Sequence, residues 1–274
     1  MATFIFLHGS FHAAWNWHKV IPLLEQAGHW GVALDLPGHG RDDTPPHQVT
    51  LDRCVDAVHQ AIETAGVTPS EKVVLVAHSR NGIVISQAAE HFPQRIAGLV
   101  YLAAYLIPNG RSMMEYALED EASLVVQNIV PRLSKRRARR LIGWFKRPLL
   151  RTLLPRLLPR AMQTHRLDQA AYRSALYHDC DDDIVALAHT LLEAEPNWAG
   201  FTPLQLSPAR YGSVPKIYIE CRQDYAVTLA LQCKMQQDTP CDRVFSMDTS
   251  HSPFFAQPDR LTQLLIESLK VCRP

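Results

Sequence analysis

The chain contains the stretch Val73-Val74-Leu75-Val76-Ala77-His78-Ser79-Arg80-Asn81-Gly82-Ile83. Its first five residues are apolar without polar alternation, which is typical of strands covered by helices on both faces of a parallel sheet. Ser79 follows this run almost directly, and the sequence after it is helix-like. The stretch therefore predicts a buried strand, a tight turn at Ser79 and a helix, as in a βαβ unit.

The same rhythm extends in both directions from this stretch. Apolar runs predict strands near 2–7, 30–35, 72–78 and 96–103, and amphipathic segments near 16–27, 52–66 and 82–92 predict helices between them. After an interruption come a helix near 181–194, a strand at 215–220, a helix near 227–236, a strand at 242–247 and a final helix from about 258. We expect an α/β fold with a mostly parallel, doubly wound sheet of about six strands.

The interruption runs from about residue 108 to residue 180. Its sequence is helix-like, is broken repeatedly by proline and contains no convincing strand. Because the sheet resumes after it, we expect this segment to lie on the sheet as an inserted helical cap. The predicted division is therefore a first part of the core at 1–107, the cap at 108–180 and a second part of the core at 181–274.

The composition is that of an ordinary globular protein. The 274 residues are 47% hydrophobic and 20% charged, with a formal net charge of +1. No stretch approaches the roughly 18 apolar residues that cross a bilayer, so we expect no stable membrane insertion, and the apolar N-terminal run favours a strand over a signal peptide. The six cysteines form no Cys-x-x-Cys pair and no zinc-like pattern with histidine. We expect reduced thiols, a cytoplasmic location and no metal.

Segment 132–166 of the predicted cap is strongly basic, because no acidic residue occurs between Glu121 and Asp168. The favoured interpretation is a solvated helix face. Docking on an anionic membrane surface and recruitment of an anionic substrate are alternatives, whereas no nucleic-acid recognition module is present to support nucleic-acid binding. Six leucines predict an apolar cap surface that faces the pocket or a partner chain, as in a homodimer, or else ordinary cap core: 149, 150, 153, 154, 157 and 158.

The turn at Ser79 resembles a nucleophile elbow, in which a sharp strand-to-helix turn lifts a serine hydroxyl above the end of a sheet. The residues two before and two after such a serine are normally glycine, but here they are Ala77 and Asn81. Alanine is the smallest alternative, and asparagine tolerates unusual backbone angles better than most residues. A strand and turn without chemistry is the competing interpretation of this segment alone.

Two later loops supply the partners that such a serine needs, each directly after a predicted strand. Asp224 follows the strand at 215–220, and His251 follows the strand at 242–247. An aspartate in this place can hold the tautomer of a histidine, which then acts as general base for the serine. A helix cap is the alternative role for Asp224. The order serine, acid, histidine is that of α/β-hydrolase triads.

A hydrolase also needs donors for the oxyanion of its tetrahedral intermediate. The loop after the first strand can supply the Ser10 amide, which would pair with the amide of Arg80, and Gly9 lets the backbone turn close to the site. Because main-chain amides are the donors of this oxyanion hole, we expect the side chains at 10 and 80 to be free to vary.

Gly9, Phe11, His12 and Trp15 are the predicted substrate-binding residues. His8 and His12 lack the glutamate and helix of a metal site, and structural hydrogen bonding is the alternative role for both.

Several segments together resemble the plant methylesterase and hydroxynitrile lyase branch of the α/β-hydrolase superfamily: His8-Gly9-Ser10-Phe11-His12-Ala13-Ala14-Trp15, Gly28-His29, Leu34-Asp35-Leu36-Pro37-Gly38-His39-Gly40, the elbow, Gln223-Asp224 and Ser250-His251. The resemblance covers nearly the whole chain except the cap. It implies the fold, the triad, the backbone oxyanion hole and a helical cap over the active site. In this branch, lyases are similar to one another in having a threonine after the first histidine and a lysine after the catalytic histidine. This chain has Gly9 and Ser252 there, which favours ester hydrolysis.

The predicted activity is that of a serine carboxylesterase, which would hydrolyse a hydrophobic small-molecule ester through an acyl-enzyme intermediate without a cofactor. Methyl esters, pyrethroid-like xenobiotics and polyketide-type metabolites are the candidate substrates. A hydroxynitrile-lyase-like or other carbon-carbon cleaving enzyme with the same triad is one alternative. The other is a non-catalytic, ligand-binding homologue, for which Ala77 and Asn81 are the best support.

Overall fold

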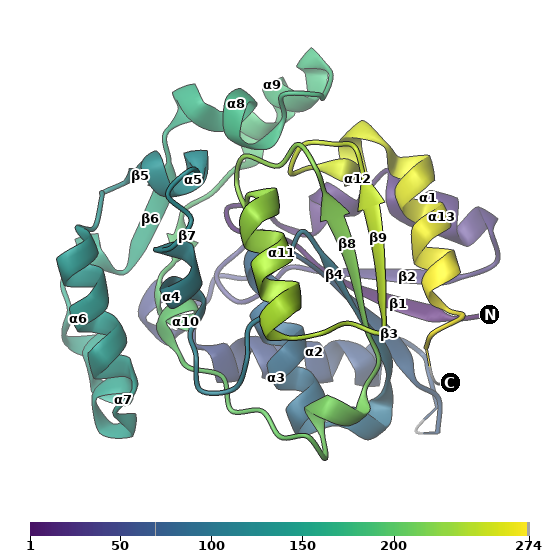
Figure 1. Cartoon of the computed structure of the whole chain (residues 1–274), viewed down its shortest axis with the longest axis horizontal. Coiled ribbons are helices and arrows are strands. Elements are labelled where there is room, and N and C mark those ends of the chain that lie inside the picture. The colour runs from purple at the N-terminus through teal and green to yellow at the C-terminus, as the bar shows by residue number, and fades with distance from the viewer. Residues whose placement is uncertain (69, 273–274) are drawn as a thin grey trace.

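The computed structural model describes residues 1–68 and 70–272, and its centre is a sheet of six strands that all run parallel (Figure 1). The order across the sheet is β2-β1-β3-β4-β8-β9. The bounds are β1 Thr3–Leu7, β2 Trp30–Leu34, β3 Val73–His78, β4 Ile96–Leu102, β8 Lys216–Cys221 and β9 Arg243–Met247. The predicted parallel sheet of about six strands is confirmed.

Helices cover both faces of this sheet, which explains why its strands are apolar without alternation. On one face, Ile5 and Leu75 pack in one cluster with helices α2 Leu51–Thr64, α3 Gly82–His91 and α11 Leu229–Asp238. On the other face, Phe4 and Val74 pack with α1 Val20–Gln26 and α13 Pro258–Ser268. Because successive strand side chains point to opposite faces, every position of β1, β3 and β4 is buried.

The chain leaves the sheet after β4 and forms the additional elements over its carboxyl edge. The helices are α4 Met113–Ala117, α5 Leu124–Gln127, α6 Lys135–Phe145, α7 Pro148–Leu157, α8 Tyr172–Leu176, α9 Asp182–Leu191 and α10 Trp198–Phe201, and α12 Pro253–Ala256 lies later in the chain. Figure 1 shows α6 and α7 at the side of the molecule farthest from the termini. The division at residues 108 and 180 stays a prediction.

The expectation that residues 108–180 contain no strand is wrong, because two short strands lie there and a third follows them in the chain. Strands β5 Ile129–Val130, β6 Thr164–Leu167 and β7 Glu195–Pro196 form a small antiparallel sheet in the order β5-β6-β7. Strands of two to four residues are too short to show an apolar period. Across residues 1–68 and 70–272, no helix has the length and apolar character needed to cross a membrane.

Candidate active site

The turn after β3 holds Ser79 in the left-handed backbone region, with φ of 56°. This is rare for a residue other than glycine and often marks a functional site. Asn81 has φ of −78° and needs no conformational freedom. Its side-chain amide instead donates a hydrogen bond to the carbonyl of His8 over 2.5 Å, which ties the elbow to the loop after β1. The departures from glycine therefore fit the turn, and Ala77 is buried within β3.

The close approach at the elbow falls one residue later, at Gly82. A Cβ atom on Gly82 would lie 2.5 Å from the carbonyl oxygen of Tyr105, whose own amide donates to the Ser79 carbonyl over 2.9 Å. The start of α3 thus packs against the chain that leaves β4.

Asp224 and His251 meet at the carboxyl edge of the sheet, where β8 and β9 end. Nδ1 of His251 lies 2.6 Å from Oδ2 of Asp224, and both side chains are buried. The other carboxylate oxygen, Oδ1, accepts the amides of Ala226 over 2.7 Å and Val227 over 2.9 Å. These bonds fix the carboxylate, which in turn fixes the orientation of the imidazole.

Ser79 and His251 line one cavity. Within residues 1–68 and 70–272, the Ser79 hydroxyl makes no hydrogen bond to His251. Such nucleophile and base pairs often close up only when substrate binds. His78 helps to hold the backbone of His251 in place, because its Nε2 lies 2.8 Å from the His251 carbonyl oxygen.

The loop after β1 passes directly beside the elbow at Gly9. A Cβ atom there would lie 2.5 Å from Nδ1 of His78 and 3.0 Å from Cβ of Ser79. Ser10 and Phe11 follow and line the cavity, and Phe11 has a left-handed φ of 68°. In the part of the chain that the structure describes, the Ser10 amide has no hydrogen-bond acceptor. It is therefore free to bind a ligand oxygen at the position where the sequence predicts an oxyanion donor.

A buried charge network lies beside these loops, and sequence reasoning missed it. The guanidinium of Arg80 forms an ion pair with Glu195 of β7, and both side chains are buried. Burial lowers the pKa of Arg80 to about 10, which still leaves it a cation at neutral pH. The expectation that the side chain at 80 is free to vary is therefore wrong, because replacing it would leave a buried carboxylate without its cation.

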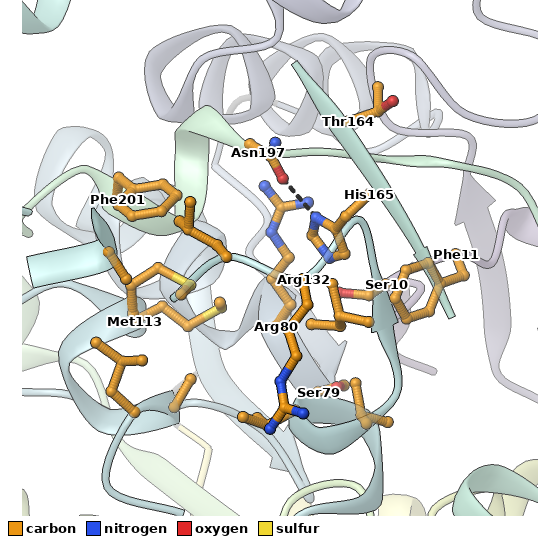
Figure 2. A pocket seen from close by; sticks show the side chains of 18 of the residues that line it. Ser10, Phe11, Ser79, Arg80, Met113, Arg132, Thr164, His165, Asn197 and Phe201 are labelled. Carbon is orange, nitrogen blue, oxygen red and sulfur yellow. Dashed lines mark hydrogen bonds between the residues drawn. The ribbon is translucent and has the colours of Figure 1, made fainter. Parts of the chain in front are cut away.

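The cavity has a volume of about 240 Å³ and a mostly apolar wall. Met113 and Phe201 belong to that wall, and Figure 2 shows them on the side opposite Phe11. The polar lining side chains include His165 of β6 and Asn197, which are hydrogen-bonded to each other. Burial lowers the pKa of His165 to about 4, so this imidazole is uncharged at neutral pH.

Among the described residues that line this cavity, Phe11 is present but Gly9, His12 and Trp15 are not. Nε2 of His12 lies 2.5 Å from the Tyr177 hydroxyl, and its Nδ1 lies 2.8 Å from the Ser10 carbonyl. Trp15 stacks between His12 and Phe255. His12 and Trp15 therefore make structural contacts in place of the predicted substrate contacts. Gly9 contributes by having no side chain, which lets the loop pass close to His78 and Ser79.

Of the three interpretations of the six cap leucines, the one that has them face the pocket is wrong, because none of them is among the described lining residues. Leu149 and Leu157 are exposed, whereas Leu154 and Leu158 pack against the cap core formed by Leu141, Ile142, Phe145, Trp198 and Phe201. The apolar cap residues that do line the cavity include Leu133, Ala138 and Leu141. Of the basic residues, Lys135 and Lys146 pair with Glu121 and Glu115. Arg132 and Arg137 line the cavity, so a solvated face does not describe the whole of segment 132–166.

Comparison with known proteins finds relatives along almost the entire chain. Residues 4–264 match the model of the alpha/beta hydrolase family. The chain is 32% identical over 271 residues to putative methylesterase 11, chloroplastic, of Arabidopsis thaliana, covering 98% of this chain but only 64% of that relative. It is 32% identical over 270 residues to methylesterase 7 of Arabidopsis thaliana, covering 96% of this chain and 95% of the relative.

A solved structure shows the same fold at lower sequence identity. The pyrethroid hydrolase from Sphingobium faniae JZ-2 superposes with a TM-score of 0.79 and 23% identity, over 98% of this chain and 97% of that one.

Proposed function

The chain belongs to the α/β-hydrolase family, in its methylesterase branch, and we propose that it is a serine carboxylesterase. Ser79 is the nucleophile, His251 the general base and Asp224 the acid that orients it. The observation that carries the proposal is the buried 2.6 Å pair of Asp224 and His251 beside a serine with φ of 56°. Ligand binding without turnover would require neither feature.

The proposed reaction proceeds through an acyl enzyme. Oγ of Ser79 attacks the ester carbonyl carbon while Nε2 of His251 accepts the hydroxyl proton, and the amides of Ser10 and Arg80 stabilise the negative oxygen. The protonated histidine then gives its proton to the departing alkoxide, which leaves as the alcohol. A water molecule, deprotonated by the same histidine, hydrolyses the acyl enzyme and restores Ser79.

The proposed substrate is a hydrophobic small-molecule ester. The apolar wall of the cavity supports this class, and its 240 Å³ volume suits a compact ligand. A cytoplasmic location and a homodimer both stay predictions.

Ester hydrolysis is favoured over cyanohydrin cleavage by Gly9. A threonine at this position, which the resemblance associates with lyases, would place its Cβ 2.5 Å from the His78 ring. Such an approach forces the elbow or its neighbour to shift. A carbon-carbon cleaving enzyme with the same triad is the second candidate.

The test is to treat the purified protein with a fluorophosphonate probe and to assay a panel of aryl and methyl esters. We expect the Ser79→Ala variant to lose labelling and at least about 10³-fold in turnover. Ser174→Ala changes an exposed serine and serves as the matched control. Labelling or turnover that survives Ser79→Ala would contradict the proposal, and aldehyde release from cyanohydrins would favour the lyase.

A further inference from the structure

Glu195 carries a buried carboxylate whose partners come from three distant parts of the chain. The residue lies in β7 and is 1% exposed. Its Oε2 accepts the Phe11 amide over 3.0 Å and lies 3.2 Å from Nε2 of His39. Its Oε1 contacts the Arg80 guanidinium. One carboxylate therefore joins the loop after β1, the loop after β2 and the elbow after β3.

A carboxylate in this environment must be held by its partners. Burying an ionised group is unfavourable unless it is paired and hydrogen-bonded. Arg80 supplies the compensating charge, because its pKa of about 10 keeps it protonated. Burial and the nearby Arg80 cation lower the pKa of His39 to about 4, so His39 contributes a neutral imidazole. The arrangement is thus one cation, one anion and two neutral partners in fixed positions.

Two of these contacts, with the Phe11 amide and with the Arg80 guanidinium, hold the segments that bear the proposed oxyanion donors. The Phe11 amide is adjacent to Ser10 in the chain, and Phe11 sits in a left-handed conformation that its surroundings must maintain. Arg80 bears the second donor on its own backbone, and its side chain ends at the same carboxylate. Oxyanion holes depend on donors that are already aimed before the negative charge develops.

We propose that Glu195 is a positioning residue that sets the spacing of the two oxyanion-hole amides by bridging Phe11 and Arg80. This inference rests on the proposed serine esterase function. Glu195 is not among the described residues that line the cavity, so it acts through its neighbours and touches no substrate. It also couples the site to the cap, because Glu195 pairs in register with His165, which does line the cavity.

The test compares Glu195→Gln with Glu193→Gln. Glu193 lies two residues earlier and is exposed, and its carboxylate accepts the Gly40 amide, so its variant is a matched control for loss of one carboxylate. For each protein, kcat and KM are measured on an ester that the wild type turns over, and kcat is divided by the active sites titrated with the fluorophosphonate. Inhibition by phenylboronic acid, whose tetrahedral serine adduct places an oxygen in the oxyanion hole, is measured alongside.

We expect Glu195→Gln to lower kcat per titrated site about 10- to 100-fold while KM changes less than about threefold. Affinity for phenylboronic acid should fall by a similar factor, and Glu193→Gln should change neither. A purely structural role would instead lower the titrated fraction and leave kcat per site intact, which would overturn the proposal.

Should Glu195→Gln not fold, Glu195→Asp keeps the charge on a shorter side chain. It must show the same fall in kcat and boronate affinity, and wild-type values would count against Glu195 as a positioning residue. A different result would show that the proposed serine esterase function itself is wrong. In that case the wild-type protein itself shows no Ser79 labelling and no ester turnover.

Discussion

Gly9 and Gly82 are the residues at which backbone segments of the site approach each other too closely for a side chain. Each would place a Cβ 2.5 Å from a neighbouring atom, at His78 and at Tyr105 respectively. Neither has the positive φ that often explains a glycine. The elbow pattern considers positions 77, 79 and 81, so it cannot indicate that Gly82 provides the close approach and that Asn81 provides a hydrogen bond.

We expect Gly9→Ala to damage both stability and activity. The new methyl group must displace the His78 ring or the Cβ atom of Ser79, which should cost about 1–3 kcal/mol in the free energy of unfolding. A shift of the elbow by about 1 Å should lower kcat/KM by about a hundredfold. Urea unfolding and ester assays measure the two effects.

Gly143→Ala is the matched control for that substitution. Gly143 lies inside α6, and no described atom lies within 4 Å of its added Cβ apart from its chain neighbours and the backbone of its own helix. Alanine should therefore stabilise the helix by about 0.5–1 kcal/mol without changing kcat/KM. If Gly9→Ala behaved like Gly143→Ala, the close approach at Gly9 would not constrain the site.

At the scale of elements, long apolar strands and the loops that follow them were predictable from the sequence. Ser79, Asp224 and His251 each directly follow such a strand or lie in the loop after it, and parallel strands bring those loops to one edge. The strand β7 was not predictable, because Glu195–Pro196 has no apolar residue and no period. A lone glutamate is usually a solvated one. Its burial arises only when residues 11, 39 and 80 assemble around it.

The cap helices divide into a packed part and a solvated part, which gives a prediction about their stability. Phe145 of α6 is 1% exposed and stacks on Trp198, with 5.8 Å between ring centroids. Leu157 of α7 is 74% exposed. We expect Phe145→Ala to lower the free energy of unfolding by about 3–5 kcal/mol, whereas Leu157→Gln should change it by less than about 0.5 kcal/mol.

Chemical unfolding of the two variants measures this difference. If unfolding is not two-state, the cap should unfold first in Phe145→Ala, and limited proteolysis would locate the cleavage in it. A large effect of Leu157→Gln would show instead that the exposed leucines of α7 are covered in solution.

Buried histidines pack behind the site between segments that are far apart in the chain. His12 lies against Tyr177 and Phe254, and His39 lies beside Glu195. Burial lowers the pKa of His12 and of His39 to about 4, from an ordinary value of 6.5. The fold therefore holds these imidazoles neutral in a range where an unfolded chain would protonate them.

This difference predicts acid sensitivity. Because the folded-state pKa is below the unfolded one, the unfolded chain binds more protons below pH 6.5, so stability falls as the pH drops from about 6.5 towards 4. Each of the two histidines should remove about 2 kcal/mol of unfolding free energy between pH 7 and pH 5. His12→Gln tests this prediction.

The variant keeps a polar partner for Tyr177 but cannot be protonated, so it should remove about 2 kcal/mol of that pH dependence. Urea unfolding at pH 7 and pH 5 measures the free energy of unfolding of the wild type and the variant, with the exposed His18→Gln as control. An unchanged pH dependence in His12→Gln would mean that His12 is protonated in the folded protein and that its burial is relieved at low pH.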